Sequence, residues 1–369
     1  MNRRERFLST MTFGTPDRPA AADYPSYDST RRRWEQEGLP RDADLNDYFG
    51  MDFDPFRWNV GGVNVSIVPG FEHRVLEETA DYRVEQRGGG EIVRVLRNVP
   101  PPAMPQWIRY PLTCRTEWPA FRQRLSPDTP GRLPANLAAI AAESAARDHP
   151  LGMWVGSTYG YMRDWWGLEA LSLLFFDEPA LIEEMIEVVT HLSVTALRRV
   201  TAAGVKLDWV MFWEDMACRS GPLMSPQMFR RFCAPFYRRV MEAVNAAGVK
   251  VVMVDSDGDV RPLVPLWLDL GVHVMHPMEV ASGMDIREER RKYGKQVAFF
   301  GGIDKRALAG SRAVIDAEVI PKLRAGFADG GFIPACDHAV PPDVSLDNYR
   351  YFRDLVNRCA REVYGPSAG

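Results

Sequence analysis

The sequence predicts a (β/α)8 barrel, and two observations support that fold class. From residue 133 onward, short apolar runs rich in β-branched residues alternate with longer stretches of helical spacing. Each apolar run is followed by polar or charged residues, as expected where a buried parallel strand ends in a loop. Six such units and two earlier strands make eight, the number in a closed parallel barrel. The sequence has no G-x-G-x-x-G motif between a strand and a helix, which makes a dinucleotide-binding sheet the weaker alternative to a barrel.

Composition restricts the class of protein. The chain has 369 residues, of which 46% are hydrophobic and 25% charged, which suits one large α/β barrel or two ordinary domains. A net charge of −4 provides no basic surface for nucleic acid or an anionic membrane. We find neither a signal-type nor a membrane-spanning apolar stretch and expect a cytoplasmic protein. The five cysteines form no C-x-x-C pair and are expected to be reduced thiols.

The first part of the chain predicts an N-terminal extension and the first two strands. A helix is expected over residues 3–11, strands over 20–24 and 62–68, and a polar helix over 29–37. Residues 78–97 consist of two alternating runs around Gly88, Gly89 and Gly90, the pattern of an antiparallel hairpin. We therefore predict one barrel domain over 1–369, with 74–105 as an inserted hairpin and a proline-rich linker, and a short helix over 113–125.

The second part predicts the remaining barrel. Six strands are expected at 151–155, 207–212, 249–254, 272–275, 297–300 and 331–334. The long helices between them are expected at 179–203, 226–247 and 313–328, each with apolar residues at helical spacing.

Polar residues at the strand ends are the candidate functional residues. Ionisable groups gathered at one end of a barrel lose solvation and repel one another, which shifts their pKa values and suits them to proton transfer. These residues are Trp154, Ser157, Tyr159, Trp213, Glu214, Asp215, Asp255, Asp257, His276, Glu279, Asp304, Lys305, Cys336, Asp337 and His338. For six of them a structural role is an alternative: Asp257 and Asp304 as helix caps, Glu214 and Asp215 as an ordinary loop pair, His276 as donor to a backbone carbonyl, and Cys336 as packing.

Asp255, Asp257 and His338 form a candidate metal site. Asp255 and Asp257 are two residues apart, so their side chains can point the same way from an extended segment, and an imidazole from another strand can complete a three-ligand site. Such ligands suit zinc, manganese or iron with one position open for substrate. As alternatives, the two carboxyl groups bind a cationic substrate group or share a proton.

Several segments resemble the uroporphyrinogen decarboxylase superfamily. They are RRERFLSTMTFGTPDRP near the N-terminus, FWEDMACRSGPLMSPQMFRRFCAPFYRRV in the middle, and FFGGIDKRAL followed by GGFIPACDHAVPPDVSLDNYRYF. The resemblance implies a (β/α)8 barrel, often dimeric, with its pocket at the carboxyl ends of the strands. The superfamily includes porphyrinogen decarboxylases and methyltransferases that act with corrinoid proteins, thiols or tetrahydrofolate.

Departures from the family pattern favour the methyltransferase-like branch. The decarboxylases carry an arginine-rich loop where this chain has AADYPSYDST, residues 21–30, without arginine. The zinc-dependent methyltransferases carry His-x-Cys where this chain has Asp255 and Asp257, and a later cysteine where it has His338. A decarboxylase remains the alternative, with Asp257 or His338 protonating a carbanion-like carbon. A non-catalytic ligand-binding barrel is the second alternative.

The resemblance and the strand-end residues together assign expected roles. We expect acid/base catalysis from Glu214, Asp257, His276 and His338. Substrate contacts are expected from Trp154, Ser157, Tyr159, Trp213, Asp215, Glu279, Asp304 and Cys336. The implied cofactors are zinc or another divalent metal, and methylcobalamin on a partner protein or tetrahydrofolate. The implied partners are a small substrate, a corrinoid protein and a second copy of the chain.

Overall fold

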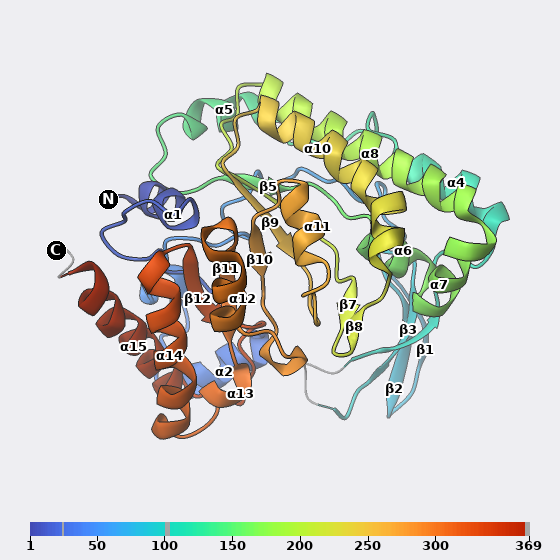
Figure 1. Ribbon diagram of the computed structural model, residues 1–369. Helices are drawn as coiled ribbons and strands as arrows, with labels where there is room; N and C mark the ends of the chain where they lie inside the picture. The colour runs from blue at the N-terminus through green and yellow to red at the C-terminus, as the bar shows by residue number, and fades with distance from the viewer. Residues whose placement is uncertain (24–25, 100–103, 366–369) are drawn as a thin grey trace.

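A six-stranded parallel sheet is the centre of the computed structural model, which describes residues 1–23, 26–99 and 104–365. The strand order is β12-β11-β10-β9-β6-β5, and a helix follows each strand, as Figure 1 shows. All six strands predicted for the second part of the chain are present: β5 (Gly152–Trp154), β6 (Trp209–Trp213), β9 (Val251–Asp255), β10 (Val274–His276), β11 (Ala298–Ile303) and β12 (Phe332–Cys336).

Two irregular segments occupy the other two strand positions of the barrel. Ala22 forms a parallel bridge with Phe53, and Asn59 forms one with Gly152 at the start of β5. On the opposite side, the backbone N–H of Cys336 donates to Asp23 Oδ1 at 3.0 Å. These two bridges and the bond to Asp23 place the segments at 20–23 and 53–60 between β12 and β5. Of the strand predicted over 20–24, only Ala22 pairs, and Tyr24 lies outside the described residues.

The strand predicted over residues 62–68 is wrong. That stretch consists of turns and bends, although its side chains alternate. Its backbone is bound by Arg132 instead of by a neighbouring strand: the Arg132 carbonyl accepts from Asn64 N–H at 2.9 Å, and the guanidinium donates to the carbonyls of Asn64 and Ser66 at 3.0 and 2.6 Å. Alternation alone therefore misplaced this strand by several residues.

The barrel interior is packed with side chains from every part of the ring. Inward-facing residues alternate along the strands and form one buried cluster of Ala20, Ala22, Phe53, Trp58, Trp209, Met211, Val251, Met253, Val274, Ala298, Phe300, Ile333 and Ala335. Phe7 and Met11 of α1 (Arg3–Met11) belong to the same cluster. Arg4 of this helix also donates to Asp208, which precedes β6. The N-terminal extension therefore closes the amino ends of the strands and leaves the carboxyl ends for the site.

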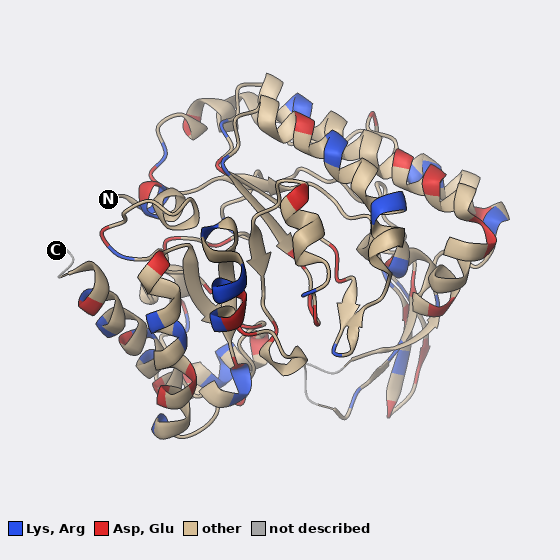
Figure 2. Cartoon of the chain, viewed as in Figure 1, with Lys and Arg blue, Asp and Glu red and all other residues tan. Residues whose placement is uncertain are grey.

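Long helices cover the outside of the barrel. The predicted long helices are confirmed as α8 (Pro179–Ala202), as the continuous run α9 (Pro226–Met228), π-helical turn (Phe229–Cys233) and α10 (Ala234–Ala246), and as α14 (Arg312–Asp329). The other helices are α2 (Asp28–Gln36), α3 (Leu45–Tyr48), α4 (Trp118–Arg122), α5 (Leu137–Ser144), α6 (Tyr159–Trp166), α7 (Leu168–Asp177), α11 (Val264–Asp269), α12 (Ile286–Tyr293), α13 (Lys305–Leu308) and α15 (Leu346–Tyr364). Basic and acidic residues are interspersed along α8 and α10 in Figure 2, as on ordinary solvated helices.

The predicted hairpin is part of a four-stranded antiparallel sheet. Its strands are β1 (Arg74–Glu78), β2 (Tyr82–Gln86), β3 (Ile92–Leu96) and β4 (Gln106–Arg109), in sequence order. β2 and β3 pair around the glycine turn as predicted. Residues 100–103 of the expected linker lie outside the described residues. Within the described part of the chain, no helix is long and apolar enough to cross a bilayer.

Candidate active site

The loops after β6, β9, β10 and β12 bring four acidic side chains to the carboxyl end of the barrel. Asp215 Oδ1 accepts from the backbone N–H of Asp257 at 3.2 Å, and Glu279 Oε2 accepts from that of Gly258 at 2.9 Å. Gly258 has φ +91°, and a Cβ there would lie 2.5 Å from the carbonyl carbon of Ala217, so only glycine fits. These bonds hold Asp257 between Asp215 and Glu279. Asp337 is the fourth carboxyl group of the set.

The carboxyl group of Asp257 has its pKa near neutral pH, so a large fraction of it is protonated there. Burial, followed by repulsion from Asp215 and Glu279, raises its pKa from 3.8 to about 7, although Lys305 opposes the shift. Its side chain remains 38% exposed, so a small molecule can reach it. Asp257 can therefore both donate and accept a proton at physiological pH.

His338 lies opposite Asp257. Its Nε2 is 3.8 Å from Asp257 Oδ2. Nδ1 accepts from the backbone N–H of Ala339 at 2.8 Å, so the neutral ring carries its proton on Nε2 and presents it toward the carboxyl group. Burial lowers the pKa of His338 and favours this neutral form. The hydroxyl of Tyr27 is 3.2 Å from Nδ1 and borders the same side of the ring.

Lys305 supplies a cation to this group. Asp337 is fully buried and accepts backbone N–H bonds from Val280 and Lys305 at 2.9 and 3.1 Å, while Lys305 Nζ lies 3.9 Å from it. Burial nevertheless raises the pKa of Asp337. The backbone bonds fix Asp337, and Lys305 is the cation beside it.

His276 and Asp255 lie below the opening. His276 Nδ1 contacts the carbonyl of Phe300 at 3.0 Å, and its ring stacks on the Phe300 ring with centroids 4.3 Å apart. Burial lowers its pKa to about 3, so the ring is neutral. This geometry matches the alternative assignment for His276, in which it binds a carbonyl. Asp255 continues the inward alternation of Val251 and Met253 and is 5% exposed.

Glu214 has a structural environment. It is fully buried, and its carboxylate accepts from the backbone N–H groups of Thr158 and Tyr159, at 3.0 and 2.8 Å, where α6 begins. The hydroxyls of Ser157, Thr158 and Tyr237 also donate to it. A carboxylate with this many donors anchors the β5–α6 loop. The predicted catalytic role of Glu214 stays a prediction, and this geometry gives it no support.

An aromatic cavity adjoins the acidic group. It has a volume of about 280 Å³ and is lined by Phe56, Trp154, Gly156, Tyr161 and Trp213. Arg163 lies over the Trp213 ring at 5.6 Å, donates to the Asp215 carbonyl at 2.8 Å and pairs with the Asp215 carboxylate at 3.4 Å. Arg163 is therefore already bound to Asp215. The cavity offers apolar aromatic surface at the ends of β5 and β6.

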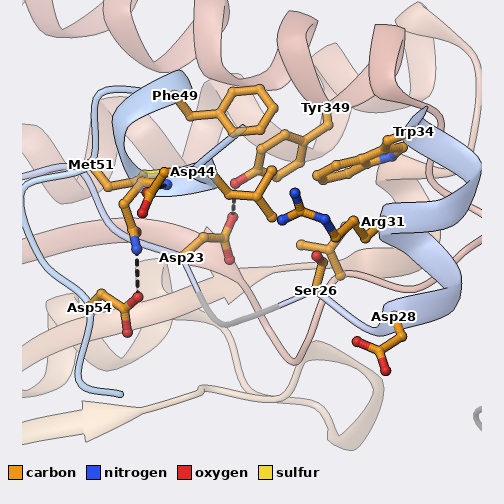
Figure 3. A pocket seen from close by; sticks show the side chains of 13 residues that line it. Asp23, Ser26, Asp28, Arg31, Trp34, Asp44, Phe49, Met51, Asp54 and Tyr349 are labelled. Carbon is orange, nitrogen blue, oxygen red and sulfur yellow. Dashed lines mark hydrogen bonds between the residues drawn. The ribbon is translucent and has the colours of Figure 1, made fainter. Parts of the chain in front are cut away.

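A second cavity lies behind the end of β12, and sequence analysis did not anticipate it. Figure 3 shows its wall. Asp23 accepts a hydrogen bond from the hydroxyl of Tyr349 at 2.7 Å, and Asp54 accepts one from the side-chain amide of Asn46 at 2.7 Å. Its volume is about 300 Å³, and its charged lining consists of Asp23, Asp28, Arg31, Asp44 and Asp54. Acidic groups therefore outnumber basic ones here as well.

The metal site predicted at Asp255, Asp257 and His338 stays a prediction; the structure places Asp257 Oδ2 3.8 Å from His338 Nε2. β9 ends at Asp255, so the two-residue alternation does not extend to Asp257, which stands in the loop. Asp257 approaches His338, while Asp255 points into the barrel beneath them. Among the residues that the structure describes, no group of three or more His, Cys, Asp or Glu side chains is placed to hold a metal ion.

The remaining predicted residues fall into two groups. Trp154 and Trp213 line the aromatic cavity, and Asp215 and Glu279 adjoin Asp257. Four others face structural partners. Ser157 bonds Glu214, Tyr159 is buried beside Phe175, Asp304 caps α13 and pairs with Arg306, and Cys336 belongs to the core between sheet and helices.

Sequence analysis missed several neighbours of the site. Tyr27 is the N-cap of α2, Phe56 lies in the irregular segment at 53–60, and Tyr161 and Arg163 lie in α6, where no strand-end signal marks them.

Comparisons with known proteins agree with this architecture. A family model described as uroporphyrinogen decarboxylase (URO-D) matches residues 98–359. Two relatives named uroporphyrinogen decarboxylase, from Syntrophotalea carbinolica and Anaeromyxobacter sp., are each 25% identical to this chain. The alignments cover 51% and 62% of this chain and 52% and 64% of the relatives, so the chain spans only about half to two thirds of their length.

A methyltransferase from Methanosarcina mazei has the same fold. It superposes with a TM-score of 0.62 at 16% identity over 97% of this chain and 99% of that one. This likeness establishes the fold, not the reaction. Because the family model matches well over half of the chain, the chain belongs to the uroporphyrinogen decarboxylase (URO-D) family.

Proposed function

We propose that this chain transfers a methyl group from a small methylated compound, with Asp257 as the proton donor. The observation that carries the proposal is the Asp257 carboxyl group, with a pKa of about 7, at an opening dominated by acidic groups. Methyl ethers and thioethers are poor methyl donors unless the heteroatom that leaves receives a proton. A carboxylic acid that keeps its proton at neutral pH supplies that proton.

In the proposed step, the bond between the methyl carbon and the heteroatom breaks while the methyl carbon bonds to an acceptor. The proton of Asp257 moves to the heteroatom. A reduced corrinoid on a partner protein, or a folate, supplies the nucleophile. The carboxylate left on Asp257 takes a proton back from solvent, and the Nε2–H of His338, 3.8 Å away, can orient the water molecule that delivers it.

Substrate binding is assigned to the aromatic cavity. Phe56, Trp154 and Trp213 offer apolar surface for the carbon skeleton, and Trp213 is two residues from Asp215, which holds the Asp257 loop. This arrangement places the methylated heteroatom toward the acid. Lys305 is available for a single anionic substituent.

The charge of the opening also opposes a substrate with many carboxylates. Asp215, Glu279 and Asp337 surround Asp257, whereas Arg163 is committed to Asp215. Each further carboxylate brought to about 6 Å from one of these groups meets roughly 2–3 kcal/mol of repulsion at an effective dielectric constant near 20. A porphyrinogen with eight carboxylates requires cations that this opening does not offer.

A decarboxylase is the second candidate function, because the family model and the two relatives above carry that name. In that reaction a carboxylate leaves as carbon dioxide, and Asp257 protonates the carbon. Because Lys305 is the cation offered to substrate there, such a substrate should carry few carboxylates.

The test supplies purified protein with cob(I)alamin and a panel of methyl ethers, methyl thioethers and methylamines, and follows methylcobalamin by its absorbance. We expect turnover with at least one donor and a loss of roughly 10²–10⁴-fold in Asp257→Asn. Asp259→Asn is the matched control, because Asp259 pairs with Arg261 in the same loop. Carbon dioxide release from carboxylated substrates without any methylated product would replace this proposal with the second candidate.

A further inference from the structure

A third cavity lies away from the active-site opening, where α15 packs against the N-terminal segments. It has a volume of about 300 Å³, roughly ten times the share of one water molecule in the liquid. The polar residues lining it are Arg18, Arg353, Asn357 and Arg361, and the others are Ala21, Phe49, Gly50, Ala360 and Gly365. None of these is acidic. Figure 1 shows α15 and α1 on the same side of the molecule, where the N-terminus also lies.

Arg353 is the central feature of this cavity. The residue is only 5% exposed, and its Nε and Nη1 atoms are buried without a hydrogen-bond partner among the described residues. No described carboxylate forms a salt bridge with it. By contrast, the buried guanidinium of Arg132 donates to backbone carbonyls through all three nitrogens. Leaving a buried charge uncompensated is costly, so a guanidinium at a cavity wall is a site for an anion.

The surrounding charges do not neutralise Arg353. Arg18 donates hydrogen bonds to Asp52 at 2.5 and 3.2 Å. Asp52 also accepts a hydrogen bond from Arg6, and Arg6 donates another to Asp17. Two arginines and two aspartates therefore balance one another. Arg361 forms no salt bridge with any residue in the described ranges and is exposed. The cavity thus retains the positive charge of Arg353 and Arg361.

The sequence spacing of three polar residues on α15 places their side chains on the side of the cavity. Arg353, Asn357 and Arg361 are four residues apart and share one face of α15. That face looks onto Ala21, in one irregular segment of the barrel, and onto Phe49 and Gly50, which follow α3. Two guanidinium groups and an amide along one helix face can donate to several oxygens of a tetrahedral anion.

We propose that this cavity binds a phosphoryl anion, either free phosphate or the phosphate group of a small phosphomonoester. The anion contacts the guanidinium groups of Arg353 and Arg361 and the amide of Asn357. It connects the end of α15 to the segments that complete the barrel. Binding therefore stabilises the fold at a place remote from Asp257.

The test measures binding of inorganic phosphate to the full chain by calorimetry, together with the melting temperature, at ionic strength held constant with chloride. Phosphate at about 100 times Kd is expected to raise Tm by roughly 3–6 °C. Arg353→Met is expected to weaken binding at least tenfold and to abolish the Tm rise. Arg361→Gln should weaken binding less, and Arg358→Met, an exposed arginine of the same helix, should leave it unchanged.

Arg353→Met also separates binding from a structural role. If Arg353 is an uncompensated charge, the phosphate-free variant melts at or above the temperature of the wild type. A variant that melts lower, together with a wild type that ignores phosphate, overturns the proposal. Glycerol 3-phosphate binding more tightly than phosphate indicates a phosphomonoester as the ligand, and equal affinity indicates free phosphate. Citrate binding as well as phosphate at the same charge would show general anion binding and refute a phosphoryl site.

Discussion

Replacing Asp257 with asparagine tests the electrostatics of the candidate site without a known substrate. The pKa of this carboxyl group rises from 3.8 to about 7 in the fold, a change of roughly 3 units. Each unit corresponds to about 1.4 kcal/mol, so full burial would imply roughly 4 kcal/mol of destabilisation when the group is ionised. Since the side chain is 38% exposed, solvent screening reduces this to about 1–2 kcal/mol.

The sign follows from proton linkage. A carboxyl group whose pKa is raised binds its proton more tightly in the folded than in the unfolded chain, so folding stability falls as pH rises from about 4 to about 7 and is level above that. An asparagine side chain at this position cannot ionise and removes this loss. Asp257→Asn should therefore be about 1–2 kcal/mol more stable than the wild type at pH 8, with less than half that difference at pH 5.

Urea unfolding at the two pH values, followed by circular dichroism, measures this difference. Asp259→Asn is the control, because pairing with Arg261 lowers the pKa of Asp259 and removal of its charge should destabilise slightly or not at all. If Asp257→Asn is less stable than the wild type at pH 8, Asp257 is a stabilising carboxylate. In that case it is not the proton donor.

Three further predictions concern the same end of the barrel. Lys305→Met removes the cation that lowers the pKa of Asp257, so the alkaline limb of the pH–activity profile should move to higher pH. An unchanged limb would show that Lys305 does not influence the pKa of Asp257. Glu214→Gln places an amide against N–H and O–H donors and should destabilise the protein by about 2–4 kcal/mol in urea unfolding, whereas a loss of activity with full stability would restore its predicted catalytic role. Burial lowers the His276 pKa to about 3, so the wild type loses folding stability as pH falls below about 6.5. His276→Gln should abolish this loss, and identical acid unfolding curves for the two proteins would contradict the prediction.

The barrel strands could be predicted because buried parallel strands are continuous apolar runs. Val251 to Val254 is apolar on both faces, since Val251 and Met253 fill the barrel while Val252 and Val254 face the helices. The hairpin was equally clear from its glycines. The run at 62–68 misled because alternation records side-chain spacing only. The hydrogen bonds that decide whether a strand forms there go to Arg132, about 65 residues later in the chain.

The site was predictable as a location but not in its roles. The carboxyl ends of parallel strands meet, so polar residues after β9 and β12 had to converge, and Asp257 and His338 do. The metal prediction assumed that Asp255 and Asp257 share one direction. β9 ends between them, which sends one carboxyl group inward and leaves the other in the loop. Whether a carboxylate is catalytic or structural depends on its donors, and those of Glu214 come from α6 and α10.

The distribution of charge separates two ligand chemistries in one chain. At the carboxyl end of the barrel, carboxyl groups outnumber cations and one of them keeps its proton, which suits a neutral or cationic donor with an apolar skeleton. Beside the end of α15, arginines line a cavity without any acidic residue. Phe49 lines both this cavity and the acidic cavity of Figure 3, so the arginine cavity borders that second acidic cavity, while Asp257 lies elsewhere. An anion that entered the molecule at random would be held at Arg353 and repelled from Asp257, and the ligand preferences of the two sites should therefore be opposite in sign.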